Sequence, residues 1–188
     1  MKKFIMAATA ILITGCASMA AGMIGYSPTL KVESKLDKMT QTWTIRSTQW
    51  GNDGHALSND PSTIMVQYKK GQDPVIASIT TYLTLGNAFY PEYADDGNKN
   101  KYKTALGWTK PDCDKYGCKW ISAVMTFMDW NDIRIKMALN PSYIYRIHGN
   151  GYADATIYPC QMWEIQNQIN KINGEKSPVE FGGKSCNG

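Results

Sequence analysis

Groups able to catalyse a reaction are scarce in this chain of 188 residues. Its two histidines, His55 and His148, are the side chains whose ordinary pKa suits general acid–base work near neutral pH. Neither lies in a recognisable partner motif, so we expect both to occupy turn or surface positions. The alternative is a hydrolase site in which scattered residues such as His148, Asp154 and Asp129 converge in space.

Motifs of cofactor and nucleotide sites are also missing from the sequence. It has no Gly-x-Ser-x-Gly elbow, no Gly-x-Gly-x-x-Gly or Walker loop and no His-Glu-x-x-His pair. Asp95 and Asp96 are adjacent rather than alternate, and the nearby Lys99 and Lys101 oppose a cation, so the calcium-loop pattern fails. The sequence predicts no cofactor, no metal and no enzymatic activity.

Aromatic side chains are the richest remaining feature, and several lie in the segment 86–118, which shows no strand or helix period. This segment is predicted to be a long loop. Its aromatic residues either form an exposed contact surface rimmed by lysines or fold beneath the loop as a small satellite core. The candidate partner-binding residues are Tyr90, Tyr93, Tyr102 and Trp108.

The first sixteen residues carry the features of an export signal. Lys2 and Lys3 precede an apolar stretch, Phe4–Ile13, that is too short to span a bilayer. The sequence Ile-Thr-Gly-Cys that ends at Cys16 resembles the lipobox of bacterial lipoproteins. That resemblance implies a Cys16 that carries diacylglycerol and acyl chains such as palmitate, and it implies a mature protein that begins there. The alternative is an ordinary signal peptide cut after Ala20.

The resemblance also implies a location. Ala17 follows the cysteine where lipoproteins retained in the inner membrane typically have aspartate, which favours the outer membrane with the domain facing the periplasm. Several acyl chains on one residue hold a protein at a membrane essentially permanently. The lipid anchor is therefore the expected contact with the membrane.

The other four cysteines, Cys113, Cys118, Cys160 and Cys186, agree with an oxidising compartment. Of the three pairings that four cysteines allow, we favour Cys113–Cys118, which flanks a tight turn, together with Cys160–Cys186. A structural zinc site is the alternative. The Cys113/Cys118 spacing is wider than zinc motifs prefer, and no histidine lies near.

Composition excludes several classes of protein. A charged share of 19% with many aromatic residues is unlike a disordered chain, and no apolar run is long enough for a membrane span. The net charge of +4 is small for this length, so we expect no nucleic-acid partner.

Hydrophobic periodicity predicts the fold. Apolar and polar residues alternate in several short segments, and Gly149-Asn150-Gly151 is typical of a hairpin, because Gly and Asn accept positive φ. Pro159 opens a segment with helical spacing that stops near Gly174. We predict a β-rich α+β fold, an antiparallel sheet or sandwich of about seven strands with one C-terminal amphipathic helix. The predicted strands lie at 42–46, 64–69, 75–85, 120–130, 133–137, 143–148 and 152–158.

The predicted organisation is a signal peptide at 1–15, a lipid-anchored tether at 16–38 and one β-rich domain at 39–188. The expected function is a non-catalytic module that binds an envelope protein or glycan. The alternatives are an exclusion or immunity lipoprotein, as in phages and plasmids, and an envelope hydrolase.

Overall fold

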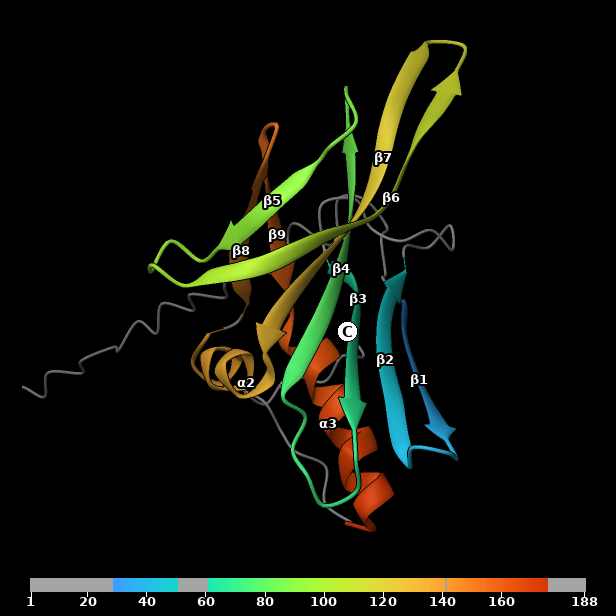
Figure 1. Ribbon diagram of the computed structural model, residues 1–188, viewed down its shortest axis with the longest axis vertical. Helices are drawn as coiled ribbons and strands as arrows, with labels where there is room; N and C mark the ends of the chain where they lie inside the picture. The colour runs from blue at the N-terminus through green and yellow to red at the C-terminus, as the bar shows by residue number, and fades with distance from the viewer. Residues whose placement is uncertain (1–28, 51–60, 141, 176–188) are drawn as a thin grey trace, which may run out of the picture.

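The computed structural model describes residues 29–50, 61–140 and 142–175. In this part of the chain, nine strands form one antiparallel sheet in the order β1-β2-β3-β4-β7-β6-β5-β8-β9, accompanied by two helices (Figure 1). The strands are β1 Thr29–Asp37, β2 Thr42–Trp50, β3 Pro61–Tyr68, β4 Ile76–Leu85, β5 Pro91–Asp95, β6 Lys101–Asp114, β7 Gly117–Asp129, β8 Tyr143–Gly149 and β9 Tyr152–Ile157; the helices are α2 Trp130–Leu139 and α3 Pro159–Asn173.

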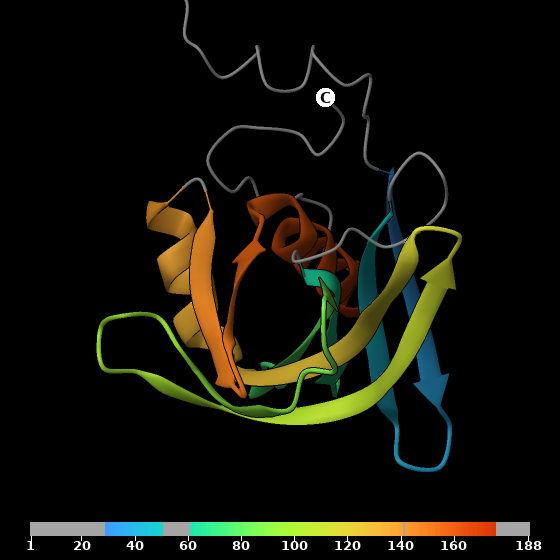
Figure 2. The same ribbon diagram turned by 90° about the horizontal axis from the view of Figure 1, so that it is seen from above.

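The prediction of a β-rich α+β fold is confirmed, but its details differ. The described residues form nine strands rather than about seven and two helices rather than one, and of the predicted antiparallel sheet or sandwich they form the single sheet. The sheet bends around the side on which α3 lies, and β9 approaches β3 (Figure 2). No helix among the described residues is long and apolar enough to cross a bilayer.

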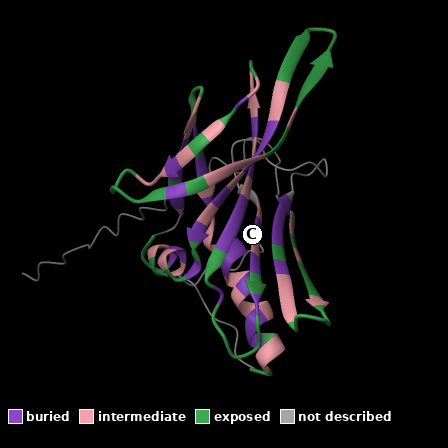
Figure 3. Ribbon diagram, in the orientation of Figure 1, coloured by how far each residue is buried: buried purple, intermediate pink, exposed green. Residues whose placement is uncertain are grey.

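We call the side of the sheet that packs on the helices the inner face. Strand alternation directs Ile45, Ile64, Ile79 and Val124 to this face, where each side chain is fully buried. Helix α3 contacts β1, β2 and β3, whereas α2 contacts β7 and β8. The core therefore lies between the inner face and the two helices, and buried residues concentrate there (Figure 3).

Helix α3 matches the prediction. Pro159 occupies its first turn, and Met162, Ile165 and Ile169 recur at helical spacing and are buried. Gly174 ends it in the left-handed conformation, with φ of 82°, and its N–H donates to carbonyls of the last turn.

Helix α2 corrects the prediction of a strand at 133–137. Ile133, Ile135 and Met137 alternate in the sequence, but only Ile133 and Met137, four residues apart, are buried, and Ile135 is exposed. The Asp129 side chain accepts a hydrogen bond from the backbone N–H of Asp132 at 2.8 Å and caps the helix. Positions 133 and 137 share a face in a strand and in a helix alike, and the Asp129 cap is a local feature that favours the helix.

The segment 86–118 is not the predicted loop, since β5, all of β6 and the first residues of β7 lie in it. Alternation is hidden there because β6 is exposed along most of its length after Leu106, where no core distinguishes one face from the other. The predicted tether also needs correction. Strand β1 pairs with β2 from Thr29 to Asp37, so the folded domain begins well before residue 39.

The turn between β8 and β9 forms where it was predicted, but for a different reason. Gly149, Asn150 and Gly151 all have φ outside the positive range. A Cβ placed on Gly149 would lie 2.0 Å from the carbonyl oxygen of Tyr90. Glycine is required there because the chain before β5 passes against it, and Asn150 fixes this contact by accepting from Tyr90 N–H at 2.9 Å.

Candidate functional site

The sheet side opposite the helices, which we call the outer face, is covered by no helix among the described residues. Strand register places one row of side chains across all nine strands of this face. In spatial order the row is Glu33, Arg46, Met65, Ser78, Phe127, Lys103, Tyr93, His148 and Tyr152. Met65 and Phe127 thus lie between Arg46 and Lys103, and aromatic rings and a histidine follow toward β9.

A groove of about 560 Å³ lies on the outer face over β3, β4 and β7. Its volume is within the range of about 300–1,000 Å³ typical of ligand sites, although it is open rather than enclosed. Outer-face side chains and the connection between β3 and β4 line it. They include Met65, Gln67, Lys69, Asp73, Val75, Ile76, Ser78, Met125 and Phe127.

An aromatic pair extends the outer face toward the far end of β6 and β7. The rings of Tyr82 and Trp108 lie 5.8 Å apart on either side of Ala123, and the Lys110 ammonium lies 5.3 Å from the centre of the Trp108 ring. A β-bulge between Leu106 and Trp108 shifts the register by one residue. Without this bulge, strand alternation would direct Trp108 to the inner face.

Beyond Trp108, β6 and β7 continue past the end of β4, whose last pair is Leu85 with Trp120, and project from the body as a two-stranded hairpin (Figure 1). We call residues 109–120 the arm. An isolated hairpin is marginally stable in water, and the Cys113–Cys118 disulfide crosslinks the arm near its tip. Tyr116 at the tip is 84% exposed. The arm thus presents a large aromatic side chain on a covalently closed support.

His148 and Asp95 form the histidine–carboxylate pair closest to what a hydrolase would need. His148 Nε2 lies 2.8 Å from Asp95 Oδ2, and its ring stacks on Tyr93 with centroids 4.6 Å apart. The two other residues considered for such a site are engaged elsewhere: Asp154 pairs with Arg146 at 2.6 Å, and Asp129 caps α2. Asp154 lies near enough to His148 to interact with it electrostatically, but its carboxylate is held by Arg146, and that of Asp129 is held by the first turn of α2.

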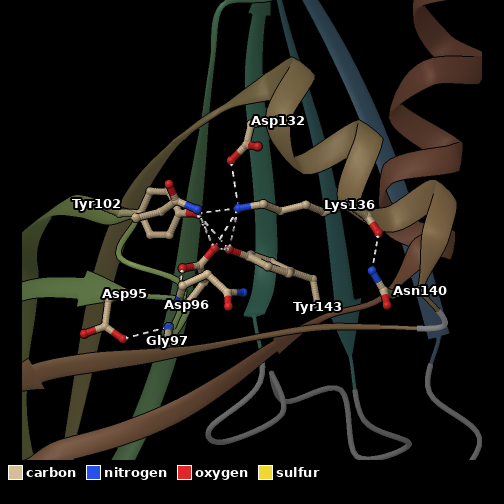
Figure 4. A network of polar contacts seen from close by, with 10 residues as sticks. Asp95, Asp96, Gly97, Tyr102, Asp132, Lys136, Asn140 and Tyr143 are labelled. Atoms are coloured by element: carbon tan, nitrogen blue, oxygen red, sulfur yellow. Dashed lines mark hydrogen bonds and ion pairs between the residues drawn. The ribbon is translucent and has the colours of Figure 1, made fainter.

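The strongest polar cluster of the described residues lies where α2, β8 and the β5–β6 turn meet (Figure 4). The Asp96 side chain is fully buried, and its Oδ2 accepts from Lys136 at 2.7 Å, Asn100 at 2.8 Å and Tyr143 at 3.0 Å. The Tyr102 hydroxyl lies 2.7 Å from that of Tyr143 and accepts from Lys136 at 3.0 Å. Every oxygen of this cluster has a partner, which indicates a structural role.

Electrostatics within this cluster favour the charged pair. Burial alone would raise the pKa of Asp96, but hydrogen bonds from Asn100 and Lys136 outweigh it and hold that pKa well below its ordinary value. Burial would lower the pKa of Lys136, yet its bonds to Asp96 and Tyr102 raise it. Burial is also the main reason why the pKa of Tyr143 is raised. None of these groups is poised to exchange a proton near neutral pH.

The four candidate partner-binding residues do not share one surface. Tyr102 is buried in the core and in the Asp96 cluster, whereas Tyr90 and Trp108 are exposed. Tyr93 is partly buried between His148 and the Lys101 ammonium, which lies 4.5 Å from its ring centre. Tyr90 and Trp108 are thus exposed as a contact surface would require, whereas Tyr102 belongs to the main core rather than to a satellite core under a loop.

The cysteines are placed in part. The predicted Cys113–Cys118 disulfide is present, whereas Cys186, the expected partner of Cys160, lies outside the described residues together with Cys16 and His55. Cys160 is half-buried at the start of α3, where burial raises the pKa of its thiol. In the described part of the chain, no three His, Cys, Asp or Glu residues gather as a metal site would require.

The sequence analysis missed the groove. The signal was present in Met65, Met125 and Phe127, apolar residues at positions where alternation directs side chains away from the core. Comparisons of the chain with protein-family models, curated proteins and solved structures find no match.

Proposed function

We propose that this protein is a lipid-anchored lipoprotein of the bacterial envelope that acts as a non-catalytic binding module for an envelope protein or glycan. The lipobox-like sequence ending at Cys16 supports the anchor and the outer-membrane location. The arm supports the binding role and is the observation that carries it.

The arm adds little to the core, because its side chains are almost all exposed, yet it is closed by the disulfide. A crosslink on such an element restricts the unfolded conformations of the arm itself. It adds little to the stability of the body. Ordering an element before it meets its partner reduces the entropy lost on binding. Tyr116 is exposed on the arm, and Trp108 at its base is 41% exposed. Tyrosine and tryptophan are among the residue types that most often anchor protein interfaces.

Site-specific photocrosslinking in native cells tests this proposal. A benzophenone amino acid in place of Tyr116 should give one abundant adduct, because the tip would lie inside the interface. The same group at Leu139, which is 79% exposed on α2, serves as the matched control and should give none. Absence of any adduct from the arm, together with turnover in a broad screen of esters, glycans and peptides, would reverse the assignment.

The anchor has its own test. The wild-type chain should incorporate radiolabelled fatty acid and fractionate with outer membranes, whereas Cys16→Ser should lose both properties. A Cys16→Ser chain that is processed and fractionates like the wild type would contradict the lipobox and favour cleavage after Ala20.

A further inference from the structure

The groove on the outer face exposes apolar side chains where a sheet facing only water would carry polar ones. Val75 is 70% and Ile76 48% exposed, and Met65, Met125 and Phe127 beside them are only partly buried. Contiguous exposed apolar side chains mark interaction sites on soluble domains. Two methionines in such a surface allow it to repack around different side chains.

Cationic side chains surround the groove. Arg46 and Lys103 lie in the row that contains Met65 and Phe127, one on each side, and Lys69 is among the lining residues. None of these three cations forms an ion pair within the described part of the chain, but Glu33 pairs in register with Arg46 and interacts with it electrostatically. Asp73 is the single acidic group among the lining residues, so Lys69 and Lys103 supply the excess positive charge beside the groove. The charge around the groove is therefore complementary to an acidic ligand.

The shape and chemistry of the groove restrict the class of ligand. Five of the eleven lining residues are apolar and six are polar, so the groove combines an apolar surface with polar side chains around it. Sites for sugars and nucleotides are concave and bury most of the ligand, whereas this groove is open. An open groove across three strands leaves one side of its occupant in water, which suits an amphipathic chain segment rather than an enclosed small molecule.

We infer that this groove binds a segment of a protein partner that inserts apolar side chains over Met65, Ile76 and Phe127 and turns acidic residues toward the surrounding cations. The inference deepens the proposed function and rests on it, since it names the chemistry of the partner that a binding module would take. It concerns a surface separate from the arm.

Selection from a random peptide library tests the inference without knowledge of the partner. The bait is the full chain purified as Cys16→Ser, so that no detergent competes for the groove. Enriched peptides should combine leucine, isoleucine, phenylalanine or methionine with aspartate or glutamate. Their affinity for Ile76→Ser should fall roughly tenfold, as expected when one apolar side chain loses its burial. Lys103→Glu should weaken binding several-fold and flatten its dependence on salt.

Two matched variants control for loss of an apolar or a charged group elsewhere. Ile144→Ser removes an isoleucine that is 60% exposed on β8, and Lys119→Glu reverses a charge on the arm; neither should change peptide affinity. Thermal unfolding of every variant checks folding, and Ile76, being half-exposed, tolerates the change better than Phe127. Failure to enrich any sequence, enrichment of basic peptides, or equal binding to Ile76→Ser would overturn the inference. If adducts from Tyr116 persist in that case, the proposed function survives without it.

Discussion

Replacing Asp96 with asparagine removes the charge on which three elements converge. Its Oδ2 accepts hydrogen bonds from Lys136 on α2, from Tyr143 on β8 and from Asn100 in the β5–β6 turn. Asparagine keeps the shape of the side chain but offers one acceptor oxygen in place of two, and its amide nitrogen must face a donor. We expect the variant to fold with α2 less firmly held to the sheet.

The size of the effect follows from the burial of the pair. Removing one member of a buried ion pair costs about 3–5 kcal/mol, because the other charge remains uncompensated. Lys136 is 21% exposed and can recover some hydration, and it retains Asp132 at 3.0 Å, so the lower end applies. A loss of about 3 kcal/mol lowers the melting temperature of a domain of this size by roughly 6–12 °C.

Thermal unfolding from pH 2 to 8 measures the effect and its origin. The folded pKa of Asp96 is lowered, so its contribution is complete well above the unfolded pKa of about 3.9 and is lost as the pH falls toward the folded value. The difference between wild type and Asp96→Asn should be constant from about pH 5 to 8 and should narrow below about pH 4. The contribution of Lys136 to stability depends on pH in the opposite direction. Because its pKa is raised in the folded state, that contribution is lost only at strongly alkaline pH.

An exposed ion pair gives the matched control. Lys31 Nζ lies 2.6 Å from Glu33 Oε1, as close as the pair in the cluster, but both side chains are more than half exposed. Glu33→Gln should leave the melting temperature almost unchanged, because solvent screens such pairs. If Asp96→Asn and Glu33→Gln shift the melting temperature equally, or if the Asp96→Asn effect does not depend on pH, the assignment of a buried structural charge is refuted.

Three further predictions concern single positions. Gly149→Ala should destabilise the domain by about 2–4 kcal/mol in denaturant unfolding, because its Cβ would lie 2.0 Å from the Tyr90 carbonyl oxygen, whereas Gly151→Ala, with no atom within 4 Å, should be tolerated; equal effects would contradict the contact. Reduction of Cys113–Cys118 should leave the melting temperature of the body nearly unchanged but expose the arm to trypsin, and resistance to trypsin after reduction would show that the strands hold the arm alone. Tyr102→Ala should cost about 3–5 kcal/mol in thermal unfolding because the ring is in the core, and a change below 1 kcal/mol would place it on the surface.

Sequence patterns predicted those elements whose two faces meet different environments. Segments 64–69 and 75–85 alternate because their inner side chains are buried in the core, and α3 has a single apolar stripe for the same reason. The same logic explains the failures. After Leu106, β6 is exposed on both faces, so its sequence does not alternate between apolar and polar residues. In α2, the two buried positions fit a strand and a helix equally well.

The candidate site could be predicted less well than the fold, because it depends on relations between strands. Trp108 faces outward because of a bulge, and Arg46, Phe127 and Lys103 share a row because of the order in which β2, β7 and β6 enter the sheet. Neither fact can be read from one segment alone. Local sequence did hold one clue, namely methionine and phenylalanine at outward positions. An apolar residue on the solvent side of a strand costs solubility without adding to the core, so its presence on adjacent strands is the pattern from which the groove on the outer face could have been predicted.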